Sequence, residues 1–128
     1  MSEPKWLLLQ TLATVQRIQI SEHGGLQGIR DQAGLEACLE RPRSAYAYGA
    51  TDLYDLAAKY AHGIVTRHPF VDGNKRMGLI AAAIFLRLNG LRLAAREVDT
   101  VIAFRSLAAG QMTEALLAVW LRENSQPL

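Results

Sequence analysis

The chain has 128 residues, of which 50% are hydrophobic and 20% are charged, so it is long enough to bury one core and too short for two. Lys and Arg total 14 against 12 Asp and Glu, and this balance argues against a polybasic membrane anchor and against a protein that wraps nucleic acid. The single cysteine, Cys38, excludes an intramolecular disulfide and a thiolate zinc cluster. We expect one domain, residues 1–128, with no direct nucleic-acid readout.

The sequence contains no segment that is apolar enough to span a membrane. The longest apolar stretch, Met77–Leu88, is interrupted by Gly78 and Arg87 and is shorter than the roughly 20 residues that a spanning helix needs. The run Leu7-Leu8-Leu9 is flanked by polar residues, so an apolar core of signal-peptide length does not develop. The cytoplasm is the expected location.

The first half of the chain has the spacing of amphipathic helices. Apolar residues recur at three- to four-residue steps and predict a helix over about 5–22, which a glycine-rich turn at 23–28 ends. A short second helix is predicted over about 31–40, and Pro42 is expected to end it. Residues 43–50 then have the pattern of an extended connection.

The second half is helical in pattern as well. Thr51 or Asp52 can cap a third helix that runs to about Arg67. After a loop, a fourth helix begins near Asn74, and because it is apolar almost all round we expect it at the centre of the core. A brief extended piece at 91–93 and two more helices, at about 96–109 and 113–123, complete the prediction of a compact all-α fold with about six helices.

The loop before the fourth helix carries the residues best suited to chemistry. The stretch His68-Pro69-Phe70-Val71-Asp72-Gly73-Asn74-Lys75-Arg76 holds an imidazole, a carboxylate, an amide, an ammonium and a guanidinium. The first N–H groups of a helix lack internal partners and carry partial positive charge, and Gly73 lets the backbone approach a ligand closely. With Lys75 and Arg76 beside them, these groups predict a phosphate-binding turn.

Two further residues of the loop extend this prediction to catalysis. Asp72 is suited to hold a divalent cation that bridges a carboxylate and nucleotide phosphates. His68 is suited to act as a general base, because imidazoles ordinarily titrate near neutral pH. Together they suggest transfer of a phosphate-containing group from a nucleotide to a hydroxyl. Structural roles remain open beside these: His68 could bind a backbone carbonyl, and Asp72 could cap the fourth helix.

The nine-residue stretch resembles the signature loop of the Fic/Doc family, written HPFx(D/E)GN(G/K)R. Lys75, where typical Fic proteins have glycine, resembles the Doc (death-on-curing) branch. The stretches His23–Asp31, Thr51–Leu53 and Phe85–Gly90 are also similar to Doc-type chains, so the resemblance covers about residues 20–90.

The resemblance implies a role for each residue of the loop. His68 resembles the catalytic base of the family, and Asp72 resembles the residue that holds magnesium. Residues 73–76, namely Gly73, Asn74, Lys75 and Arg76, resemble the turn that binds the nucleotide phosphates. The segment at about 43–49 resembles the flap that aligns the substrate, in which Tyr46 and Tyr48 either flank a peptide substrate or cover the core.

One position separates the branches of the family. Fic proteins that transfer AMP generally carry a second Arg three residues after the first, and here that position is Leu79. Its absence is similar to Doc proteins, which are toxins that transfer the γ-phosphate of ATP to elongation factor Tu and are restrained by a small antitoxin. The resemblance therefore implies ATP and Mg²⁺ as cofactors, a cognate antitoxin as partner, and a Ser or Thr hydroxyl of a translation protein as acceptor.

Three alternatives stay open on the sequence alone. The same loop could transfer AMP, and Gly73 is like typical Fic proteins, whereas some Doc members carry Ala there. The chain could also be a catalytically idle module that binds an antitoxin. A metal-dependent nuclease that uses His68 and Asp72 is the least favoured, because one carboxylate is thin support for a two-metal site.

Overall fold

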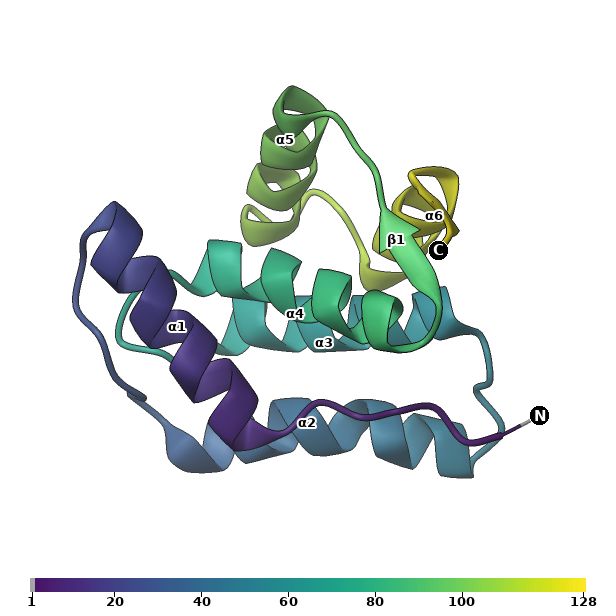
Figure 1. Ribbon diagram of the computed structural model, residues 1–128, viewed down its shortest axis with the longest axis horizontal. Coiled ribbons are helices and arrows are strands. Elements are labelled where there is room, and N and C mark those ends of the chain that lie inside the picture. Colours follow the sequence, from purple (N-terminus) through teal and green to yellow (C-terminus); the bar gives the residue numbers. More distant parts are fainter. Residues whose placement is uncertain (1) are drawn as a thin grey trace.

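Two helices, α3 (Leu53–Arg67) and α4 (Asn74–Leu88), lie side by side at the centre of the molecule in a computed structural model that describes residues 2–128 (Figure 1). Gly78 lets them approach closely, because a Cβ atom there would lie 2.6 Å from Val65 Cγ2. The inward face of α4, which includes Met77 and Phe85, is fully buried. The predicted central helix is confirmed.

Four other helices surround this pair, as the predicted all-α fold of six helices requires. Helix α2 (Gln32–Ala47) lies along one side of the pair, and α5 (Glu97–Ala108) and α6 (Glu114–Glu123) lie along the other (Figure 1). Helix α1 (Leu9–His23) crosses near the end where α3 joins α4. None of the helices formed by residues 2–128 is long and apolar enough to cross a membrane.

A small two-stranded sheet joins both ends of the chain to the end of α4 that lies far from the loop. Strand β1 (Leu91–Leu93), the predicted extended piece, pairs antiparallel with β2 (Ser125–Pro127), and the Leu128 N–H donates to the Gly90 carbonyl at 3.0 Å. The Asn89 side chain exchanges hydrogen bonds with the Lys5 backbone at 2.9 and 3.1 Å. The predicted extended piece is therefore half of a clasp between the termini.

The prediction that Pro42 ends the second helix is wrong. Helix α2 continues through Pro42 to Ala47, so residues 43–50 are not an extended connection. A proline inside a helix removes one backbone hydrogen bond and crowds the preceding turn. Here Pro42 is buried, and the Tyr46 ring packs edge-on against Trp6 with 5.6 Å between ring centroids. Tertiary packing therefore outweighs the local preference.

An ionic cluster attaches α6 to the two helices beneath it. The Glu114 carboxylate accepts hydrogen bonds from Arg41 of α2 and, at 2.9 Å, from Lys59 of α3. Burial alone would raise the pKa of Glu114, but these two hydrogen bonds outweigh it and hold the pKa below its ordinary value of 4.5.

We expect Glu114→Gln to lower the free energy of unfolding by about 1–2 kcal/mol at neutral pH, because it weakens two hydrogen bonds to a charged acceptor. The lowered pKa means that this stabilisation is present above pH 4.5 and is lost as the pH falls through the pKa of the folded state. Urea unfolding of both proteins at neutral and at acidic pH measures the difference. A difference that stays constant below pH 4.5 would contradict the ionic origin.

Candidate functional site

The loop between α3 and α4 starts with a residue in an unusual backbone conformation. His68, which ends α3, has φ 53° and ψ 55°, and within residues 2–128 it is the only non-glycine residue with positive φ. This left-handed region is sterically unfavourable for a residue with a Cβ atom. Its side chain is exposed at the surface. The surrounding structure must therefore hold His68 in place.

Arg30, which lies between α1 and α2 in the chain, provides that support. Its Nε donates to the His68 carbonyl at 2.7 Å, and its Nη2 donates to the Arg67 carbonyl at 2.8 Å. The backbone N–H groups of Arg30 and Asp31 both donate to the Pro69 carbonyl, at 2.8 and 3.0 Å. A positive charge thus lies at the negative end of the α3 dipole and fixes the backbone that carries the imidazole.

A buried glutamine joins the same segment to the other end of the loop. Gln16 of α1 is 2% exposed, and its Nε2 donates to the carbonyls of Leu26 and Asp72, both at 3.3 Å. Its Oε1 accepts from the Gly28 N–H at 3.1 Å, and the Val71 N–H donates to the Gly28 carbonyl at 3.0 Å. The segment 24–31 therefore forms one wall of the site.

Asn74 holds the loop closed from within. Its Oδ1 accepts from the Phe70 N–H and its Nδ2 donates to the Phe70 carbonyl, both at 3.0 Å. Phe70 is 1% exposed and lies beneath the loop, as the sequence predicts. The Asn74 side chain is therefore occupied within the protein, and what it can offer a phosphate is its backbone N–H at the start of α4.

Asp72 does not cap α4. Its carboxylate accepts from the Leu26 N–H at 3.2 Å and from the Gly73 N–H at 3.0 Å, whereas Gly73 is the capping residue and no side chain caps the helix. The alternative role of Asp72 as a helix cap is thus wrong, and the first N–H groups of α4 have no side-chain partner.

Asp72 retains the capacity to bind a cation. It is exposed, and with one hydrogen bond to each oxygen its carboxylate keeps further lone pairs available. No group of three or more His, Cys, Asp or Glu residues suited to a metal occurs within residues 2–128. The residues present therefore fit Mg²⁺ only in the way nucleotide sites use it, with one carboxylate, phosphate oxygens and water.

The predicted loop residues surround a single hollow of about 510 Å³. Lys75 and Arg76 are exposed and have no carboxylate within 4.0 Å among residues 2–128. Two unpaired cations at a helix N-terminus oppose the helix dipole, so the hollow is electrostatically prepared for an anion. Its lining comes from α1, the loop and the first turn of α4: Ile20, His23, Gly24, His68, Val71, Asp72, Gly73, Asn74, Lys75 and Arg76.

The predicted position of the substrate flap is wrong. Tyr46 and Tyr48 lie near the start of α3, whereas His68 lies at its end, and a helix of 15 residues is about 22 Å long. Tyr46 is half-buried against Trp6, which matches the alternative that it covers the core, and Tyr48 is 93% exposed. The segment that flanks the site is 24–31.

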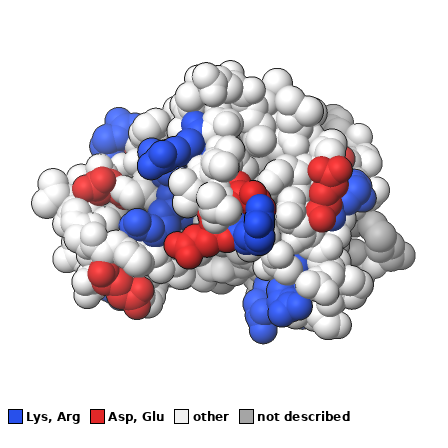
Figure 2. All heavy atoms as spheres, turned by 90° about the horizontal axis from the view of Figure 1, so that it is seen from above, with Lys and Arg blue, Asp and Glu red and all other residues white. Residues whose placement is uncertain are grey.

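The surface around the site shows no broad field of one sign. Figure 2 shows basic and acidic side chains interspersed on the face seen from above. This distribution agrees with the expectation from the composition that the chain is not built to wrap nucleic acid.

Comparisons with known proteins agree with the geometry of the loop. The family model described as "Fic/DOC family" matches residues 6–86. Among curated proteins, the chain is 36% identical over 85 residues to "Protein kinase doc" of Escherichia phage P1, across 66% of this chain and 68% of that protein. It is 41% identical over 75 residues to "Toxin Doc" of Mycolicibacterium smegmatis, across 56% of this chain and 57% of that protein. The chain belongs to the Fic/Doc family.

Proposed function

We propose that this protein is a Doc-type toxin that transfers the γ-phosphate of ATP to a Ser or Thr hydroxyl of a translation protein, such as elongation factor Tu. The observation that carries the proposal is the hollow in which an imidazole, a carboxylate and two unpaired cations meet at the uncapped start of α4. The printed names of the two relatives, a protein kinase and a toxin, support the same class of activity.

His68 carries the proton transfer in this mechanism. Its imidazole accepts the proton of the acceptor hydroxyl while the hydroxyl oxygen forms a bond to the terminal phosphorus. The bond between that phosphorus and the bridging oxygen breaks, and ADP leaves. The left-handed backbone at His68, fixed by Arg30, places the imidazole at the edge of the hollow.

The other residues of the hollow bind the phosphates. The first N–H groups of α4, Lys75 and Arg76 stabilise the negative charge of the phosphate chain. Asp72 would hold Mg²⁺, and the residues present fit this ion as described above. When bound, Mg²⁺ neutralises charge on the phosphates.

Leu79 supports phosphate transfer over AMP transfer. It lies one turn after Arg76 on α4 and is half-buried, so this position offers no second guanidinium to the phosphate chain. The test compares label transfer from ATP to bacterial lysate protein, with the label on the γ-phosphate or on adenine. Label from the γ-phosphate alone supports the proposal. Adenine label on protein would establish AMP transfer instead, and no transfer from either would favour the idle module.

We also propose that a small antitoxin protein is the partner of this chain, because both matched relatives are Doc proteins and one is named as a toxin. Induced expression of the chain is expected to arrest growth. Co-expression with the antitoxin encoded beside it is expected to restore growth. Cleavage of RNA by the pure protein would instead revive the nuclease alternative.

Arg30 is expected to act as a positioning residue in this mechanism. Arg30→Ala removes two charge-assisted hydrogen bonds to the backbone at His68, and we expect kcat to fall about tenfold to a hundredfold. The KM for ATP should stay unchanged, because Arg30 is not among the residues that line the phosphate hollow. Steady-state kinetics separates the two constants.

Arg67→Ala is the matched control, since it removes the same charge from the same end of α3. The Arg67 side chain makes no hydrogen bond or ion pair with residues 2–128, whereas the Arg30 side chain makes two. Equal losses in the two variants would show that net charge matters and that the position of His68 does not.

A further inference from the structure

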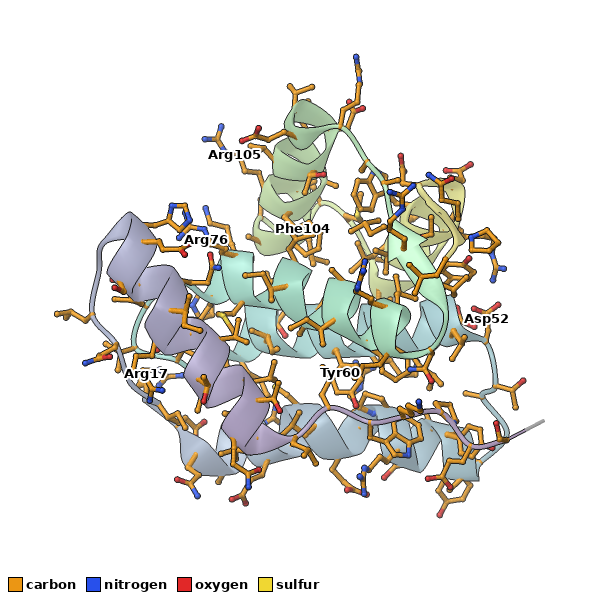
Figure 3. The ribbon with its side chains drawn as sticks, in the orientation of Figure 1. Arg17, Asp52, Tyr60, Arg76, Phe104 and Arg105 are labelled. Atoms are coloured by element: carbon orange, nitrogen blue, oxygen red, sulfur yellow. The ribbon has the colours of Figure 1, made fainter. Side chains whose placement is uncertain are left out.

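A second, smaller groove adjoins the phosphate hollow on the side of α5. It has a volume of about 210 Å³, and its walls are formed by α4 and α5. Leu79, Val101 and Phe104 make its surface mostly apolar, and Lys75, Arg76 and Arg105 add positive charge. Figure 3 shows Arg76 and Arg105 on the same side of the molecule, between the end of α1 and α5.

The groove is continuous with the phosphate hollow through two side chains. Lys75 and Arg76 line both, so a ligand whose phosphates bind these cations can place an uncharged part against α5. Arg105 is exposed and has no carboxylate within 4.0 Å among the residues that the structure describes. The groove therefore offers apolar contact with positive charge at its rim.

The chemistry of the groove matches the base and sugar of a nucleotide. Pockets for small ligands are mostly apolar with a few placed polar groups, and a complete pocket occupies about 300–1,000 Å³. At about 210 Å³ the groove suits a part of a ligand, such as a base. Guanidinium groups such as that of Arg105 also interact favourably with the face of an aromatic ring.

The larger hollow beside α1 is less suitable. It has a volume of about 770 Å³ and includes the acidic side chain of Glu22, but neither Lys75 nor Arg76 lines it. A nucleotide that placed its base there would have to extend its phosphates past a carboxylate before it reached the cations of α4.

We propose that the groove between α4 and α5 is the nucleoside site of this protein, an inference that rests on the nucleotide-dependent function proposed above. The base contacts Leu79 and Val101 over the buried ring of Phe104. The phosphate chain then runs from the groove past Lys75 and Arg76 into the hollow, and its terminal phosphate lies nearest His68.

This placement gives Leu79 a positive role. In the groove it supplies apolar surface to the base, whereas an arginine there would place a charge against the base. The orientation that presents the terminal phosphate to His68 thus follows from where the apolar surface lies.

The test measures calorimetric binding of ATP and of inorganic tripolyphosphate, which has the phosphates without the nucleoside. We expect the wild-type protein to bind ATP about tenfold more tightly than tripolyphosphate, since the base buries apolar surface. Val101→Gln puts a longer polar side chain into the groove without changing charge. It is expected to weaken ATP binding about tenfold and to leave tripolyphosphate binding unchanged.

Val98→Gln is the matched control, because Val98 is exposed on the same helix and does not line the groove. It should change neither affinity. Equal wild-type affinity for the two ligands would overturn the nucleoside site, as would equal ATP affinity in the Val101 and Val98 variants. The comparison in the wild-type protein holds even if a variant fails to fold.

Other outcomes separate this inference from the proposed function. Tripolyphosphate that binds as tightly as ATP would leave the phosphate hollow supported and remove the groove from the site. If neither ligand binds the wild-type protein, the nucleotide-dependent function itself is wrong and the groove has no role in it. Adenine label on the acceptor would overturn the orientation.

Discussion

Replacing His68 by alanine is expected to lower the rate of phosphoryl transfer by roughly 10²–10⁴-fold, the usual contribution of a positioned general base. ATP binding should remain, because the uncapped start of α4, Lys75 and Arg76 are untouched. The variant should also be at least as stable as the wild type within about 0.5 kcal/mol, since the His68 side chain is exposed. Single-turnover transfer of γ-phosphate label and calorimetric ATP binding measure the two effects separately.

His62→Ala is the control for the loss of an imidazole. His62 lies on the same helix, half-buried beside Glu114 at 3.6 Å, and does not line the hollow. It should leave transfer close to the wild-type rate. Transfer by the His68 variant at that same rate would show that the hydroxyl proton is not taken by His68 and would refute the mechanism.

Asn74→Ala is expected to affect both stability and binding. It removes two hydrogen bonds and leaves the N–H and carbonyl of Phe70 buried without these partners, at a cost of about 3 kcal/mol. For a domain of this size that corresponds to a fall of roughly 10 °C in Tm. Because the loop is no longer closed, the affinity for ATP should fall about tenfold. Thermal unfolding and calorimetric titration provide the two measurements.

Asn89→Ala gives a matched comparison at the opposite end of the same helix. The Asn89 side chain also bonds to backbone, at 2.8 Å to the Phe85 carbonyl and at 3.1 Å to the Lys5 carbonyl. Its loss should lower Tm without changing ATP affinity. If both variants lose ATP affinity in proportion to their loss of stability, the role of Asn74 is general to the fold and not specific to the loop.

The sequence predicts well the features that depend on local patterns. The apolar spacing of α4, the Asp52 cap of α3, which accepts the Tyr54 N–H at 2.8 Å, and the extended piece at 91–93 all follow from residues close together in the chain. The grouping of His68, Asp72 and the cations also follows, because nine consecutive residues cannot lie far apart.

The features that the sequence does not predict depend on contacts between distant segments. The continuation of α2 past Pro42 depends on the burial of that proline and on the contact of Tyr46 with Trp6, 40 residues away in the chain. Without that contact, the proline rule gives a flap in the wrong place.

The supports of the loop have the same origin. Arg30 and Gln16 act on residues 37 or more positions later in the chain, at Arg67, His68 and Asp72. A polar side chain in an amphipathic segment gives no local sign of such a partner. Only the stretch His23–Asp31, which resembles Doc-type chains, marks this segment at all.

The clasp at the far end of α4 has a practical consequence for experiments on living cells. Lys5 and Leu128 are both bound to the residues just after α4, at Asn89 and Gly90, one helix length from the hollow. A fluorescent protein or an affinity tag fused at either residue would therefore start about 22 Å from His68. Labelled forms can thus report on location and binding partners while the reaction centre stays open to its substrates.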